Sequence, residues 1–217
     1  MNPLHDAHEI ANALKAIPRT WDGKKAILAM KDANGRWRDT EWPGWYFQFL
    51  CEEHLRCLLR MPGPTYGNVQ FDGLKTIPWD FKCHALHPKK NNILLNDAEA
   101  ILRAVNEYGM VGYVLALGPA QEDNPSQDFK RWHDQLKGKK SQYVLEREAR
   151  GASSRRRKVS YELQEIRFLK IDKTTLDSRC GTFQEDFRNA NGSPRRAKVK
   201  INLEALGKEE YLHSLKF

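Results

Sequence analysis

The segment FDG at residues 71–73, followed by IPWDFKC at residues 77–83, is the most informative part of this chain. Apolar and polar residues alternate from residue 77 to residue 83, which predicts a strand, because successive side chains of a strand point to opposite faces. Asp80 and Lys82 therefore share one face. Asp72 ends a short apolar run at residues 69–71, and a strand, a tight turn and a returning strand would bring it beside Asp80.

Two carboxylates and a lysine at one point have a definite chemistry. Carboxylates that lie close together repel each other and need a cation between them, while an adjacent lysine can orient a water molecule and stabilise developing negative charge. Two carboxylates and a lysine are the side chains that metal-assisted hydrolysis of a phosphodiester needs. In the alternative interpretation, Asp72 is a turn residue of an Asp-Gly pair, and Asp80 and Lys82 form a solvated cross-strand face.

The flanking segments predict an ordered set of elements. A largely buried helix is expected at residues 42–60, because Trp42-Pro43 is a typical helix start and apolar residues cover much of its surface. After the two strands of the motif we expect a polar loop at residues 86–92 and a helix at residues 97–108, with Asn96 as its N-cap and Gly109 as its C-terminal glycine. The continuous apolar run at residues 110–117 predicts a central strand that is buried on both faces.

In this order of elements, Asp72 and Asp80-Phe81-Lys82 resemble the D…(D/E)-x-K signature of the PD-(D/E)xK nuclease superfamily, whose small members include the type II restriction endonucleases. The resemblance covers roughly residues 42–118, and Phe71 stands where the family often has proline. It implies an α/β fold of mixed α+β type, in which helices flank a central mixed β-sheet. On this basis the chain has a restriction-endonuclease-like core with a basic C-terminal extension.

The resemblance also implies roles for individual residues. Asp72, Asp80 and the Phe81 carbonyl would hold one or two Mg²⁺ ions, and Lys82 would position the attacking water. The family usually adds a glutamate or glutamine from the helix before the first strand. Glu52 is our candidate for this further catalytic contact, and the alternatives Gln48 and Glu53 remain open, as does a solvated stripe formed by Glu52, Glu53 and Arg56.

The implied function is Mg²⁺-dependent, sequence-specific cleavage of double-stranded DNA by a type II restriction endonuclease, which leaves a 5′-phosphate and a 3′-hydroxyl. Cutting both strands of a palindromic site needs two active sites, so a homodimer is expected. Two alternatives remain open. One is a repair or recombination nuclease on the same core, which nicks DNA or resolves junctions. The other is a catalytically silent DNA-binding protein.

Length and composition agree with a soluble DNA-binding enzyme. The 217 residues suffice for one nuclease domain, which we expect to span residues 1–217. The net charge of +8 suggests a polyanionic partner, and on its own it also fits binding to membrane lipid or simple solubility. No apolar run reaches the roughly 18 residues that a membrane span needs, and the first residues do not resemble a secretory signal. The four cysteines contain no C-x-x-C pair, so buried thiols in a cytosolic protein are the simplest expectation. The resemblance to restriction endonucleases implies the cytoplasm of a bacterial or archaeal cell.

Basic residues concentrate beyond residue 120, in the part that we expect to contact DNA (about residues 120–217). Charge runs are usually solvated surface, but on a nuclease they are typical of phosphate contacts, and arginine can also pair with guanine edges. Including two lysines that follow the motif, the candidate DNA-binding residues are Lys89, Lys90, Lys139, Lys140, Arg155, Arg156, Arg157, Lys158, Arg195 and Arg196.

The remaining segments give less specific predictions. Residues 6–17 and the segment after Asn124-Pro125-Ser126 each predict an amphipathic helix, and residues 24–30 fit a helix or a strand. Residues 159–171 alternate weakly and fit a strand or one arm of a hairpin. A short strand with a cationic face is expected at residues 195–201, and a closing helix at residues 203–215.

Overall fold

The computed structural model describes the chain apart from residues 1, 89–90, 141, 152–155, 185 and 189–191. Its α-helices are α1 (Pro3–Leu14), α2 (Gly23–Asp32), α3 (Trp42–Leu55), α4 (Ala98–Tyr108), α5 (Asp128–Lys137), α6 (Gln142–Ala149) and α7 (Lys173–Arg179). Its strands are β1 (Thr20–Asp22), β2 (Thr65–Tyr66), β3 (Val69–Gln70), β4 (Gly73–Leu74), β5 (Pro78–Ala85), β6 (Asn92–Asp97), β7 (Met110–Gly118), β8 (Ala120–Glu122), β9 (Lys158–Glu162), β10 (Glu165–Asp172), β11 (Cys180–Phe183), β12 (Lys198–Asn202) and β13 (Tyr211–Lys216).

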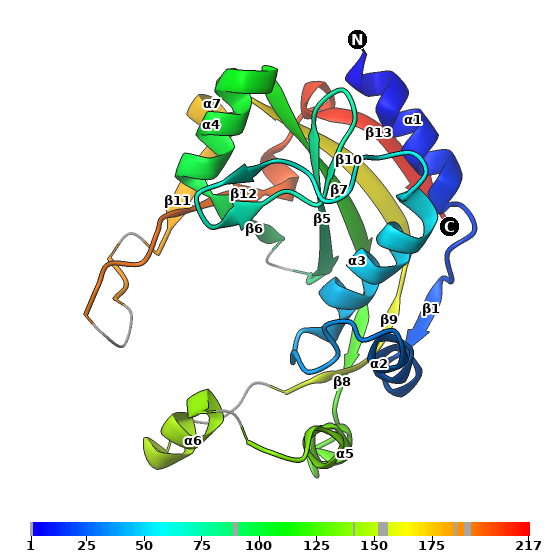
Figure 1. Ribbon diagram of the computed structural model, residues 1–217, viewed down its shortest axis with the longest axis vertical. Helices are drawn as coiled ribbons and strands as arrows, with labels where there is room; N and C mark the ends of the chain where they lie inside the picture. Colours follow the sequence, from blue (N-terminus) through cyan, green and yellow to red (C-terminus); the bar gives the residue numbers. More distant parts are fainter. Residues whose placement is uncertain (1, 89–90, 141, 152–155, 185, 189–191) are drawn as a thin grey trace.

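A five-stranded mixed sheet with the order β13-β10-β7-β5-β4 forms the centre of the molecule (Figure 1). Strand β7 runs parallel to β5 and antiparallel to β10. The parallel pair requires a crossover connection, which β6 and α4 supply. Every residue of β7 after Met110 is buried, so the prediction of a central strand covered on both faces is confirmed. The predicted mixed α/β fold with a helix-flanked mixed sheet is confirmed at this level.

Two hydrophobic clusters cover the two faces of this sheet. Because side chains alternate along a strand, Val114 and Ala116 of β7 join Trp79 and Phe81 of β5 in a cluster with α1, α2 and α3. On the opposite face, Tyr113 and the other alternate residues of β7 pack against α4 and against a small sheet of order β11-β12-β6. The alternation predicted for residues 77–83 therefore has its apolar side in the core.

A third sheet, of order β1-β9-β8, lies below the central sheet in Figure 1, together with α2, α5 and α6. Trp21 of β1 stacks on Tyr161 of β9 with 4.7 Å between the ring centroids, and both side chains are buried. The segment at residues 159–171 thus contains β9 and β10, which belong to different sheets. The central sheet takes β10 and β13 from the C-terminal half, so it extends well beyond the expected core at residues 42–118.

Several of the predicted helices are confirmed with shifted ends. The helix expected at residues 6–17 is α1, the segment at residues 24–30 lies in α2, and the helix after Asn124 is α5. Helix α3 begins at Trp42 as predicted but ends at Leu55, five residues before the expected end. Helix α4 ends at Gly109, whose φ of 80° is a left-handed conformation that glycine adopts without strain.

Two local predictions are wrong, and a third is correct apart from its end. The closing helix expected at residues 203–215 is replaced by two short 3₁₀ turns, Leu203–Ala205 and Lys208–Glu210, and by β13, which pairs with β10 and so satisfies the backbone groups at this edge of the sheet. The polar loop expected at residues 86–92 is confirmed for its described residues apart from the last, because β6 begins at Asn92. Asn96 is not the N-cap of α4, because it lies within β6 and Asp97 occupies the cap position.

Within the described part of the chain, none of the helices combines the length and the apolar character needed to cross a bilayer.

Candidate active site

The short hairpin of β4 and β5 places Asp72. Gly73 pairs with Trp79 in an antiparallel register, so Asp72 lies beside β5 at the level of Asp80. One Asp72 carboxylate oxygen, Oδ2, accepts a hydrogen bond of 2.7 Å from the backbone N–H of Phe81. The structure therefore brings Asp72 next to Asp80, as the hairpin interpretation predicts. This bond fixes the carboxylate at the edge of the sheet.

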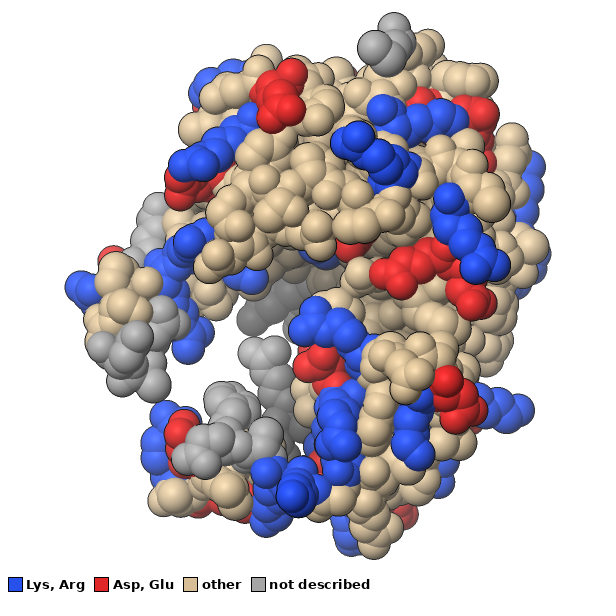
Figure 2. Space-filling model, in the orientation of Figure 1, with Lys and Arg blue, Asp and Glu red and all other residues tan. Residues whose placement is uncertain are grey.

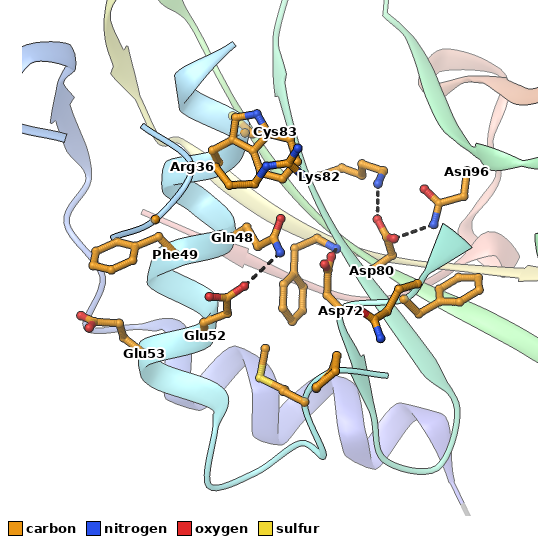
Figure 3. Close-up of a pocket in the computed structure, with 18 of the residues that line it drawn as sticks. Arg36, Gln48, Phe49, Glu52, Glu53, Asp72, Asp80, Lys82, Cys83 and Asn96 are labelled. Carbon is orange, nitrogen blue, oxygen red and sulfur yellow. Dashed lines mark hydrogen bonds and ion pairs between the residues drawn. The ribbon is translucent and has the colours of Figure 1, made fainter. Parts of the chain in front are cut away.

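Asp80 is deeply buried, with only 2% of its surface exposed. Its Oδ2 atom accepts a hydrogen bond of 2.5 Å from the side-chain amide of Asn96 on β6, and its Oδ1 atom forms an ion pair with the Lys82 ammonium group (Figure 3). Lys82 itself is partly exposed, at 28% of its side-chain surface. The i, i+2 spacing thus places the lysine and the carboxylate on one face of β5, with the lysine toward solvent.

Electrostatics at this point disfavour two negative charges. Burial, followed by the charge of Asp80, raises the pKa of Asp72 to about 8, although Lys82 and the Phe81 N–H partly oppose the shift. Burial and then the same Asp80 charge raise the pKa of Tyr113, which pairs with Asp80 across β5 and β7. Without a cation, Asp72 therefore holds a proton at neutral pH.

The carboxylates line a cleft of about 1050 Å³ between α3, the β3–β4 segment and β5. Gln48, Glu52 and Glu53 all border it from α3. Figure 3 shows that Gln48 and Glu52 point toward the middle of the cleft, where Asp72 lies, whereas Glu53 points away. The Gln48 side-chain amide donates a 2.9 Å hydrogen bond to Glu52, and the charge of Glu52 contributes to the raised pKa of Asp72.

The donor set suits Mg²⁺, which typically takes one or two carboxylates and completes its coordination with water and other oxygens. The Asp80 Oδ1 atom is buried and forms an ion pair with the Lys82 ammonium group, so a metal at this carboxylate would share it with the lysine. Because N–H and C=O of one strand residue point to the same edge, the Phe81 carbonyl also faces the Asp72 side. Across the described residues, no group of three acidic, cysteine or histidine side chains is close enough to hold a metal, so Glu52 is not placed as a direct third ligand.

The candidate DNA-binding residues are dispersed over the surface. Lys89, Lys90 and Arg155 lie outside the described residues. The side chains of Lys139, Arg156 and Arg195 are exposed. Three others form ion pairs: Lys140 with Glu148 (2.8 Å), Lys158 with Glu41 (2.6 Å) and Arg196 with Asp97 (3.7 Å). Figure 2 shows Lys and Arg side chains on both sides of a hollow between the part that carries α5 and α6 and the extension that carries β11.

Arg157 differs from these surface cations. It is only 8% exposed, donates to the Asp134 carboxylate at 2.6 Å and also lies against the Lys130 carbonyl oxygen. The structure therefore gives its guanidinium group a structural partner on α5, and we no longer count it among the residues that face DNA. A basic run in the sequence does not reveal such a partner, because Asp134 lies 23 residues away.

Three residues that border the cleft were not identified from the sequence: Asn96, Arg36 and Trp45. The short apolar run Ile93-Leu94-Leu95 is a signal in the sequence that could have predicted a strand leading to Asn96. The arginine and the tryptophan come from different elements, and no local pattern joins them.

Comparison with known proteins gives no relative for this arrangement: no family model, no curated protein and no solved structure matches the chain.

Proposed function

We propose that this chain is a Mg²⁺-dependent endonuclease that hydrolyses phosphodiester bonds of double-stranded DNA. The observation that carries the proposal is the hydrogen bond between Asp72 and the N–H of Phe81, because it joins the two halves of the motif at one edge of the sheet. The carboxylates of Asp72 and Asp80 and the ammonium group of Lys82 then border a single cleft. This is the donor set that metal-assisted hydrolysis of a phosphodiester needs.

The chain's own residues divide the work. Asp72, Asp80 and the Phe81 carbonyl would hold the metal. A bound Mg²⁺ lowers the pKa of a water molecule and neutralises charge that develops on the phosphate. Lys82 is partly exposed beside Asp80, where it can orient the attacking water and stabilise the phosphate oxygens. Asn96 holds the Asp80 carboxylate in one orientation. Glu52 contributes negative charge near Asp72 and would act on a water held at the metal rather than on the metal itself.

The order of elements supports a finer assignment to a PD-(D/E)xK-type core. Helix α3, the Asp72 segment, β5 with Asp80 and Lys82, helix α4 and the buried strand β7 follow each other in the order that the resemblance implies. Strand β6 stands between β5 and α4 but belongs to another sheet. Within this group we favour a type II restriction endonuclease that acts as a homodimer and leaves 5′-phosphate and 3′-hydroxyl ends.

The test is incubation of the purified protein with plasmid and phage DNA, in Mg²⁺ and in EDTA, followed by gel electrophoresis. Discrete Mg²⁺-dependent bands are expected. Nicks or a smear would favour the repair or recombination alternative. Binding without cleavage of unmethylated DNA from several sources would refute the enzyme and leave the silent DNA-binding protein.

Variants assign the site. Asp80→Ala and Lys82→Ala are expected to abolish cleavage and retain DNA binding. Lys170→Ala is a matched control, because Lys170 forms an ion pair with Asp172 at the same i, i+2 spacing on β10, a strand of the same sheet, and the two lysines are similarly exposed. Normal cleavage by both site variants would show that the hydrolytic centre lies elsewhere.

A further inference from the structure

Arg36 borders the same cleft as the two aspartates but belongs to a different part of the chain. It follows the turn that ends α2, where Asn34 has a left-handed φ of 57° and the Gly35 N–H donates to the Met30 carbonyl at 2.7 Å. A Cβ atom at residue 35 would lie 3.2 Å from that carbonyl oxygen, which leaves little room for any side chain. This tight turn fixes where Arg36 leaves the backbone.

The Arg36 side chain is held by an aromatic ring although it is 65% exposed. The carbon atom at the centre of its guanidinium group lies 3.7 Å from the centroid of the Trp45 ring, and Trp45 projects from the start of α3. Stacking of this kind holds the planar group by one face and leaves the N–H donors at its edge available. Figure 3 shows Arg36 and Gln48 on the α3 side of the cleft, across from Asp80 and Asn96.

Only one carboxylate contacts this guanidinium group in the described part of the chain. Asp39 lies 3.5 Å from the Nε atom, and both side chains are well exposed, so this ion pair is weak in water. The contact uses Nε, and the two Nη groups have no hydrogen-bond partner among the described residues. An arginine that is held in one place with donors available is suited to a phosphate oxygen pair.

The cleft is large enough to receive more than one phosphate of a DNA strand. A DNA strand carries a phosphate every 3.4 Å or so along the helix axis. A cleft of about 1050 Å³ that reaches from Asp80 to the end of α2 therefore receives a length of strand rather than a single phosphate. The carboxylates of Asp72 and Asp80 make one side of the cleft acidic, so a cation has to bind there before a phosphate can approach. Arg36 is positively charged and can bind a phosphate directly.

Resting on the proposed function, we infer that Arg36 binds a backbone phosphate of the DNA strand next to the phosphodiester that is cleaved, and that Trp45 holds Arg36 in position for this contact.

The test is DNA binding as a function of salt, measured by fluorescence anisotropy with a labelled mixed-sequence duplex in Ca²⁺ without Mg²⁺. Each phosphate contact contributes about 0.9 to the slope of log affinity against log salt. We expect Arg36→Ala to lower this slope by about 1 and to weaken binding roughly fivefold to tenfold at low salt. Arg36→Lys should keep the slope, because it keeps the charge, and lose part of the affinity.

Arg19→Ala is the matched control. Arg19 is also an exposed arginine over an aromatic ring, with 5.5 Å to the centroid of Phe217, but it does not border the cleft. Its removal should leave the slope unchanged. If Arg36→Ala leaves the slope of log affinity against log salt unchanged, the inference is overturned. This holds when the affinity stays the same, and also when it falls, because a fall without a change of slope indicates a contact with a base. If the wild-type protein does not bind DNA at all, the proposed function itself fails.

A double-mutant cycle tests the role of Trp45. If Trp45 acts through Arg36, Trp45→Ala weakens DNA binding, Trp45→Phe restores most of it, and adding Trp45→Ala to Arg36→Ala costs nothing further. Circular dichroism confirms that each variant is folded. Additive losses would show that the ring contacts DNA by itself, and this result would overturn the positioning role.

Discussion

Asp72→Asn is expected to stabilise the metal-free protein at alkaline pH. The asparagine carboxamide oxygen can still accept the hydrogen bond from the Phe81 N–H, while the negative charge beside Asp80 disappears. The pKa of Asp72 is about 8 in the folded protein and about 4 in an unfolded chain. Between these values the folded protein binds more protons, so its free energy of unfolding falls as the pH rises, and the loss is complete above about pH 8.

The size of the effect follows from this difference. A shift of about four pKa units corresponds to a ceiling of about 5 kcal/mol. Asp72 is half-buried, so solvent screens part of the repulsion. We therefore expect Asp72→Asn to raise the free energy of unfolding by about 2 kcal/mol at pH 8.5 and by little at pH 5. For a chain of this length the gain raises Tm by about 4–8 °C.

Thermal unfolding in EDTA, followed by circular dichroism at pH 5, 7 and 8.5, measures this gain. Glu53→Gln, which removes a negative charge from the same cleft, is the control and should not reproduce the pH dependence. Added Mg²⁺ at pH 8.5 should raise the Tm of the wild type and leave that of Asp72→Asn unchanged, because a ligand stabilises only the state that binds it. A variant that is no more stable than the wild type at pH 8.5 would refute the raised pKa of Asp72 and the cost of charging this buried group beside Asp80.

Three further predictions concern other parts of the molecule. Gly112→Ala should lower the free energy of unfolding by about 1–3 kcal/mol, measured by thermal or urea unfolding, because the new Cβ atom would lie 2.4 Å from the Trp79 ring. The control Gly181→Ala should lower it far less, because its Cβ atom would meet nothing closer than 4.0 Å. Asn96→Ala should lower the cleavage rate in Mg²⁺ by about tenfold to a hundredfold, since it releases the Asp80 carboxylate; an unchanged rate would remove Asn96 from the site. Arg157→Ala should lower Tm and leave the salt dependence of DNA binding unchanged, and a reduced slope would return Arg157 to the DNA-contacting surface.

Local sequence patterns were sufficient to predict the elements in which buried and exposed residues follow a regular pattern along the chain. The alternation at residues 77–83 and the apolar run at residues 110–117 correspond to β5 and β7, because a strand with one or two buried faces carries that information in its own residues. Gly109 marked the end of α4 for a similar reason, since its conformation is a local requirement. The position of Asp72 beside Asp80 followed from a hairpin of only a few residues.

The remaining features depend on partners that are distant in the sequence. Residues 211–216 form a strand because β10 offers an open edge, which nothing within that segment indicates. Arg157 is buried because Asp134 faces it, and Asn96 joins the site because β6 passes beside β5. The contact of Arg36 with Trp45 is likewise a product of how α2 and α3 pack.

The topology of the central sheet has a consequence for synthesis on the ribosome. Asp72, Asp80 and Lys82 have all been made once residue 82 is added, but β7, which pairs with β5, follows only at residues 110–118, and β10 and β13 follow after residue 164. At roughly 5–20 residues per second, the nascent chain carries its acidic pair for several seconds without the sheet that orients it. During this interval the two carboxylates are not held in the geometry of the folded protein, and a truncated translation product that ends near residue 118 would expose the open edge of β7 to aggregation.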